Sequence, residues 1–256
     1  MSSRFVFVGG LHRSGTSLTA DLLAASAGAS GLVDTGHMED EGHYLHDVVP
    51  SAFTYGGPGK FAFDDRCQLG PSSSPEEDRR RLLAAWAHYW ADGDATVKVE
   101  KSPQNLVQAR WLQSVFPDAR FVMVTRHPAV VALATMKWTR PGPAKLRRLL
   151  PTASMESLLR HWVVAHERFA ADRPHLDHET VVRFQDVLDG VALGELGDWL
   201  DLELPPSPGR RSAGHYQRQW ETWRGSRDGQ KAARSWLPEV AEAIAPWGYG
   251  LDDELV

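Results

Sequence analysis

Apolar runs that suit buried strands alternate along this chain with stretches in which apolar residues recur at helical spacing. The runs predict strands at residues 4–8, 96–100, 121–125 and 180–184, with a short candidate strand at 32–33. The helical spacing predicts helices at residues 16–27, 75–91, 104–116, 128–137, 155–171 and 187–200. Strands that alternate with helices of this length favour an α/β fold with a doubly wound parallel sheet.

Two segments lack either pattern. Residues 34–70 are rich in glycine, proline, aspartate and aromatic residues, and residues 139–153 are basic and broken by prolines. Because long irregular stretches in a compact domain are usually functional, we expect both to lie on the substrate side. No Gly/Ser linker and no internal repeat divides the chain, so residues 1–256 are expected to form one domain.

Composition and charge limit the partners and the cellular location that we expect for the protein. A formal net charge of −5 argues against non-specific binding to nucleic acid, so no nucleic-acid partner is expected. No apolar run approaches the roughly 20 residues of a membrane span, and the start of the chain does not have the pattern of a secretory signal. Its single cysteine, Cys67, excludes an internal disulfide. A cytoplasmic protein with no membrane span is therefore expected, and its oligomeric state is left open.

The turn at residues 10–17 has the spacing of a phosphate-binding loop and joins the first predicted strand to the first predicted helix. In loops that bind nucleoside triphosphates, a lysine after the second glycine reaches the β- and γ-phosphates, but here that position is Thr16. The groups that hold one phosphate remain: backbone N–H groups at a helix start, the charge of Arg13, and the residues Ser14, Gly15, Thr16 and Ser17. A ligand with a single 5′-phosphate suits this loop better than ATP does.

Three motifs in order resemble those of sulfotransferases, enzymes that use 3′-phosphoadenosine 5′-phosphosulfate (PAPS). Residues 13–17, Arg-Ser-Gly-Thr-Ser, are similar to the 5′-phosphosulfate loop of the bacterial-type family. Arg126 follows a strand, as does the arginine that binds the 3′-phosphate in that family. Residues 100–103, Glu-Lys-Ser-Pro, resemble a segment of the glycan sulfotransferases whose lysine lies near the scissile bond. The resemblance implies that PAPS is the co-substrate, that no metal is required, and that the chain adopts the P-loop-like sulfotransferase fold.

The chain departs from the family pattern at several positions. The family has a serine eight residues after its 3′-phosphate arginine, and this position is Ala134, with Thr135 or Lys137 as possible substitutes. The aromatic residue that stacks on adenine in the family is Leu18 here. A basic segment that includes Arg211 resembles the one that closes over the 3′-phosphate, although an exposed charged tail would have the same composition.

Sulfuryl transfer needs an oriented donor, a base for the acceptor proton, and positive charge on the departing oxygen. Lys101 is the candidate for that charge, with Arg13 as its partner. Residues 41–45, Glu-Gly-His-Tyr-Leu, resemble the Glu-x-His/Gln-Phe-Phe pattern that carries the base in glycan sulfotransferases. Glu41 is thus the expected base and His43 its hydrogen-bonding or acceptor-positioning neighbour. A solvated acidic loop remains the simpler interpretation.

Other acidic and basic residues near these motifs have secondary roles in this interpretation. Glu39 and His46 are the reserve candidates for the base, and Glu100 is expected to hold Lys101 by charge pairing.

Two other functions fit the same loop. One is a small-molecule kinase, disfavoured by Thr16 and by the lack of an aspartate at the end of an apolar strand, where such enzymes hold their metal. The other is a non-catalytic nucleotide-binding module, which Ala134 and Leu18 keep open. The acceptor is expected to offer a hydroxyl or an amine, but a small molecule, phenol, glycan, lipid or secondary metabolite all fit, because acceptor choice depends on loops whose conformation the sequence does not fix.

Overall fold

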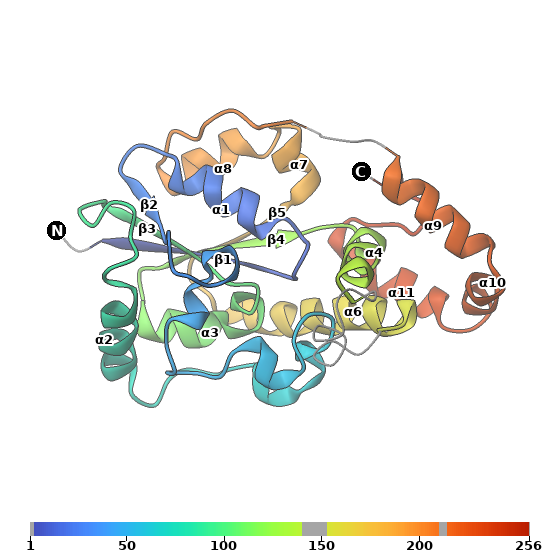
Figure 1. The fold of residues 1–256 in the computed structure, drawn as a ribbon, viewed down its shortest axis with the longest axis horizontal. Coiled ribbons are helices and arrows are strands. Elements are labelled where there is room, and N and C mark those ends of the chain that lie inside the picture. The colour runs from blue at the N-terminus through green and yellow to red at the C-terminus, as the bar shows by residue number, and fades with distance from the viewer. Residues whose placement is uncertain (1–2, 140–152, 210–213, 256) are drawn as a thin grey trace.

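The computed structural model describes residues 3–139, 153–209 and 214–255 (Figure 1). Its centre is a parallel five-stranded sheet in the order β2-β3-β1-β4-β5. The strands are β1 (Arg4–Gly10), β2 (Ala29–Gly31), β3 (Val97–Lys101), β4 (Arg120–Thr125) and β5 (Glu179–Arg183). The predicted α/β fold with a doubly wound parallel sheet is therefore confirmed.

Helices cover both faces of the sheet. Above it in Figure 1 lie α1 (Thr16–Ala24), α7 (Phe184–Leu188) and α8 (Leu193–Leu200). Below it lie α2 (Pro75–Trp86), α3 (Asn105–Val115) and α6 (Met155–Asp172). At the right of the view are α4 (Pro128–Thr139), α9 (His215–Gly225), α10 (Arg227–Ala233) and α11 (Leu237–Ile244), with α4 and α11 packed on α6.

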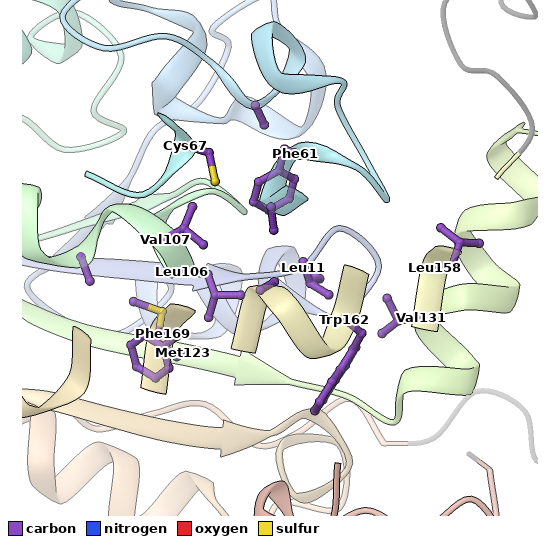
Figure 2. Packing of buried hydrophobic residues seen from close by; sticks show 14 of the residues in the cluster. Leu11, Phe61, Cys67, Leu106, Val107, Met123, Val131, Leu158, Trp162 and Phe169 are labelled. Carbon is purple, nitrogen blue, oxygen red and sulfur yellow. The ribbon is translucent and has the colours of Figure 1, made fainter. Parts of the chain in front are cut away.

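The core has two parts because successive residues of a strand point to opposite faces of a sheet. Phe5 and Phe7 of β1 face the layer of α3 and α6, whereas Val6 and Val8 face that of α1, α7 and α8. Figure 2 shows the first part, with Leu106, Met123 and Phe169 from α3, β4 and α6. With both faces covered, the carboxyl-terminal edge of the sheet is the place for a ligand.

The second strand was predicted in the wrong residues, directly after those that form it. Strand β2 runs from Ala29 to Gly31 rather than through 32–33; Leu32 forms only an isolated bridge to Trp90, and Val33 is exposed. The strand lies close beneath α1, where a Cβ on Gly31 would be 3.0 Å from that of Ala24. Small residues are required there, so the strand has no apolar signal.

Two helices also differ from their predicted bounds. The helix expected at 187–200 is divided into α7 and α8, and Gly190 between them has a φ of 76° that an α-helix cannot contain. The helix expected to end at residue 91 ends at Trp86, because the chain beyond it pairs with the β2 region, where Ala91 N–H donates to the Gly31 carbonyl.

Residues 34–70 contain five short 3₁₀ helices and no longer helix or strand. This segment is anchored, since Phe61 and Cys67 are buried in the core beside Val107 (Figure 2). It therefore presents fixed side chains to the edge of the sheet. The other expected substrate-side segment, 139–153, lies outside the described residues except for its two ends.

Candidate active site

The turn between β1 and α1 has the backbone of a phosphate-binding loop. Arg13 and Gly15 have φ angles of 72° and 100°, and this left-handed backbone turns successive N–H groups inward. Ser14 is 1% exposed, and its hydroxyl has no hydrogen-bond partner in the described part of the chain. A buried hydroxyl without a partner at the start of a helix is suited to an oxygen of a bound phosphate.

A cavity of about 240 Å³ opens beside this turn, at the carboxyl-terminal edge of the sheet. The predicted site residues that line it are Arg13, Gly15, Thr16, Ser17, Glu41 and Arg126. The structure thus brings together residues from the first turn, the 3₁₀ segment and the end of β4. Met38 and Pro103 also line the cavity and were not predicted, because neither carries chemistry that a motif would reveal.

Lys101, the last residue of β3, forms a buried ion pair with Glu41. Its Nζ lies 3.2 Å from Glu41 Oε1, and both residues are 6% exposed. The ammonium also donates to the carbonyl of Glu39 at 2.9 Å. Burial raises the pKa of Glu41 to about 7, although the charge of Lys101 opposes this rise. A carboxyl group with this pKa is suited to exchange protons near neutral pH.

Glu39 places its carboxylate among the cationic and hydroxyl groups of the cavity. It accepts a hydrogen bond from Ser17 Oγ and lies 4.0 Å from Arg13 Nη1 and 3.8 Å from Lys101 Nζ. Its backbone has a left-handed φ of 53°, and that of Asp40 is 49°. The reserve candidate for the base thus contacts the groups predicted to hold the donor.

Glu100 does not pair with Lys101 as expected. Neighbouring residues of a strand point to opposite faces, so its carboxylate turns away from the cavity. It accepts hydrogen bonds from Ser102 Oγ at 2.6 Å, Asn105 Nδ2 at 2.7 Å and the Gly42 N–H at 3.1 Å. Burial raises the pKa of Glu100, and these donors together with Lys101 oppose the rise.

His43 lies directly behind Glu41, with Nδ1 3.4 Å from Glu41 Oε2. Burial lowers the pKa of His43 to about 3, so the ring is neutral at working pH. His46, the other reserve candidate, packs edge-on against Trp86 and does not line the cavity. The structure therefore joins His43 to Glu41 and leaves His46 outside the lining of the cavity.

Arg126 follows β4 and lies on the far side of the same cavity. Its guanidinium is 4.9 Å from the ring centre of Phe184 and 5.6 Å from that of Tyr216, and Nη1 donates to the Arg13 carbonyl at 3.3 Å. Planar aromatic rings on both sides fix a guanidinium without neutralising it. The predicted arginine thus lies next to the phosphate-binding turn.

The residues at which this chain departs from the family pattern lie in different parts of the structure. Ala134 lines the cavity, whereas Thr135 lines a separate small cavity beneath it. Lys137 Nζ lies 4.8 Å from the ring centre of Tyr216, which lines the cavity. Leu18 packs against the core of the α1 face, and Arg211 lies outside the described residues.

Among the residues that the structure describes, no cluster of three or more His, Cys, Asp or Glu side chains has the arrangement of a metal site. No described helix combines the length and the apolar character that crossing a bilayer requires.

A parallel sheet whose first strand leads through a phosphate-binding turn into a helix defines the P-loop type of α/β fold. Within that class, the chain belongs to the sulfotransferase family, which it matches over residues 6–205. The family assignment confirms the resemblance that the three motifs indicated.

Two solved structures have a similar fold. Sulfotransferase STF1 from Mycobacterium tuberculosis has 17% sequence identity and a TM-score of 0.56, and the match covers 96% of this chain and 77% of that one. Sulfotransferase STF9 from Mycobacterium avium has 16% identity and a TM-score of 0.57, with 100% of this chain and 78% of that one covered. A search of curated proteins gave no significant match.

Proposed function

We propose that this protein transfers a sulfuryl group from PAPS to a hydroxyl or amine of an acceptor molecule. The observation that carries the proposal is the buried Lys101–Glu41 pair, in which Glu41 lines the cavity beside a lysine-free phosphate-binding turn. Membership of the sulfotransferase family supports the reaction class.

The donor would be held at two ends. The unpartnered Ser14 hydroxyl, the N–H groups of the turn, Arg13, Thr16 and Ser17 suit the 5′-phosphosulfate. Arg126 suits the 3′-phosphate, with Lys137 nearby and Arg211 as a further contact implied by the family pattern. Tyr216 offers an aromatic surface beside them in place of the one missing at Leu18.

The proposed step is an in-line displacement at sulfur. The acceptor oxygen or nitrogen forms a bond to sulfur as the bond from sulfur to the bridging oxygen breaks, and that electron pair leaves with the 5′-phosphate. The acceptor proton passes to Glu41. Lys101 and Arg13 stabilise the negative charge that develops on the departing oxygen. Met38, Tyr44 and Pro103 line the cavity on the Glu41 side, where a small-molecule, glycan or secondary-metabolite acceptor would approach.

The proposal is tested with labelled PAPS and a panel of hydroxyl and amine acceptors, beside labelled ATP with Mg²⁺. We expect label to pass from PAPS to at least one acceptor, and we expect the 3′,5′-bisphosphate product to bind more tightly than ATP. Transfer of the ATP γ-phosphate would instead support a kinase. Tight bisphosphate binding without any transfer across a broad panel would support a nucleotide-binding module.

A further inference from the structure

A chain of buried hydrogen bonds runs behind the Lys101–Glu41 pair, from Glu100 through Ser102 to His43. Ser102 Oγ donates to Glu100 Oε1 at 2.6 Å, accepts from the backbone N–H of His43 at 3.2 Å, and lies 3.2 Å from His43 Nδ1. These three residues are 2%, 0% and 4% exposed. Trp86 Nε1 donates to the Gly42 carbonyl at 3.1 Å and fixes the backbone before His43.

One placement of the protons satisfies all the hydrogen bonds that link Glu100, Ser102 and His43. Glu100 accepts from Ser102, Asn105 and Gly42, and three donors favour the ionised carboxylate, which can only accept. The Ser102 proton is therefore directed at Glu100. Its oxygen faces His43 Nδ1 with a lone pair, so Nδ1 must carry a proton to form a hydrogen bond.

Two further contacts of the His43 ring favour the same tautomer. Nδ1 also lies 3.4 Å from Glu41 Oε2, an oxygen that a bare nitrogen would repel. Nε2 is buried and has no hydrogen-bond partner in the described chain, so a proton there would be an unsatisfied buried donor. A proton on Nδ1, in contrast, has two acceptors within reach.

We propose that Glu100 and Ser102 are positioning residues that fix the Nδ1–H tautomer of His43 and thereby hold Glu41 in place as the base. In this arrangement Lys101 holds Oε1 of Glu41 and neutral His43 holds Oε2, so neither oxygen is free to rotate away from the acceptor. The inference rests on the proposed function, since it assigns Glu41 the acceptor proton.

Several titratable and charged groups surround Glu41 and act on its pKa together with the hydrogen-bond chain. Lys101 of β3 and Glu39 and His43 of the 3₁₀ segment lie beside it, and the charge of Glu100 acts on it from the other face of β3; His12, His37 and His46 also act on His43. Among these, Lys101 and His43 are the groups whose nitrogens approach the carboxylate within 4 Å. Loss of the His43 donor removes a bond to the ionised form, so the pKa of Glu41 rises.

Ser102→Ala tests the relay through the pH profile of turnover. Without the hydroxyl, the Nδ1–H form of His43 loses one of its two acceptors and its preference over the Nε2–H form weakens, so we expect the acid limb of kcat to move to higher pH by about one unit, the effect of losing one hydrogen bond to a charged group. The KM for PAPS should stay within about twofold, because Ser102 contacts no group assigned to the donor. Ser102→Thr keeps the hydroxyl and should keep the acid limb of the unmodified protein.

Ser26→Ala is the matched control. Ser26 is a buried serine just after α1 whose hydroxyl donates to the Leu22 carbonyl at 3.4 Å, and it does not line the cavity. This variant loses a hydroxyl of the same kind and should leave the pH profile unchanged. An equal shift in both variants, or no shift in Ser102→Ala, would overturn the proposal.

Two substitutions of His43 distinguish its nitrogens. The amide nitrogen of asparagine occupies the place of Nδ1, and that of glutamine the place of Nε2. We expect His43→Asn to keep the acid limb of the unmodified protein and His43→Gln to move it as Ser102→Ala does, whatever happens to the maximal rate. The reverse result would mean that the donor is Nε2 and would refute the assigned tautomer.

Nitrogen-15 NMR of the imidazole reads the tautomer without any substrate. We expect the Nδ1–H form for His43 in the unmodified protein and a mixture of tautomers in Ser102→Ala. An Nε2–H form in the unmodified protein would overturn the inference even if sulfuryl transfer is found. The Nδ1–H form in a protein without transfer activity would refute the proposed function and leave the hydrogen-bond chain intact as a structural feature.

Discussion

Glu41 is the residue whose chemistry depends most on its surroundings. A carboxyl group in water is a weak base at neutral pH, but burial raises the pKa of Glu41 to about 7. A general base works only in its deprotonated form, so kcat should rise with pH through about 7 and then level off. Glu41→Gln should lower kcat by about 100-fold or more at the plateau, the usual contribution of a base. Steady-state rates at several pH values test both.

Glu39→Gln shows whether the base is Glu41 or the other carboxylate of the same segment. If Glu41→Gln kept near-normal turnover and Glu39→Gln abolished it, the base would be in the same segment but at the other carboxylate. Activity in both variants would place the base outside this segment.

Lys101 has a separate expected signature. Lys101→Ala should lower kcat by about 100-fold, the effect of removing one preorganised donor from a departing oxygen. Because its charge also favours ionised Glu41, the acid limb should move to higher pH in this variant. Calorimetry should find bisphosphate affinity nearly unchanged for Glu41→Gln and Lys101→Ala. A large loss of affinity for Lys101→Ala would place the lysine on a donor phosphate instead.

Arg126 should distinguish two nucleotides that differ by one phosphate. Arg126→Ala is expected to weaken binding of the 3′,5′-bisphosphate by about 10- to 100-fold, the range for one charge-assisted contact, and to leave a 5′-monophosphate nearly unaffected. Arg80→Ala removes an exposed arginine paired with Glu77 and is the matched control. Equal losses for both nucleotides would contradict the assignment to the 3′-phosphate.

At the scale of elements, the first turn depends on its contact with α7. Gly15 has a φ of 100°, and a Cβ there would overlap the ring of Phe184, which in turn lies under Arg126. Gly15→Ala should lower stability by about 1–3 kcal/mol through backbone strain and displacement of the ring, and it should weaken bisphosphate binding. Thermal unfolding and calorimetry measure these effects. Gly36→Ala has a similar φ of 76° in open space and separates strain from overlap.

Elements with a strong local signal could be predicted from the sequence. Strands β1, β3 and β4 lie within two residues of their expected bounds, because buried apolar side chains recur along each of them. Strand β2 could not be predicted, because its contact with α1 selects the small residues Ala29, Ser30 and Gly31.

The candidate site also has parts that the sequence could predict and parts that it could not. The phosphate-binding turn and Arg126 follow from motifs at strand ends, which the parallel topology brings to one edge. The direction of Glu100, its link to His43 through Ser102, and the position of Glu39 depend on contacts between segments some 60 residues apart. No local pattern encodes such contacts, so the expected Glu100–Lys101 pairing was wrong.

At the scale of the whole molecule, the positive charges in and beside the cavity come from separate segments: Arg13 and Arg126 line it, and Lys101 pairs with the carboxylates of Glu39 and Glu41 that line it. The net charge is nevertheless −5.

Because Thr16 replaces the lysine of triphosphate-binding loops, we expect turnover to persist in excess chelator. Transfer assays with and without EDTA measure this. An absolute need for Mg²⁺ with consumption of ATP would move the protein to the kinase class.

The contacts of Glu39 have a consequence for how the nucleotide would leave. Its carboxylate accepts a hydrogen bond from Ser17 and lies near Arg13, two residues proposed to hold the 5′-phosphate, so a side chain of the protein competes with the product for these groups. As the bisphosphate departs, this carboxylate can take over its contacts, and the cations are not left without an anion. Glu39→Gln, which keeps the shape and removes the charge, should therefore bind the bisphosphate several-fold more tightly and release it more slowly, in stopped-flow displacement, than the unmodified protein. Weaker binding would mean that Glu39 supports the nucleotide instead of competing with it.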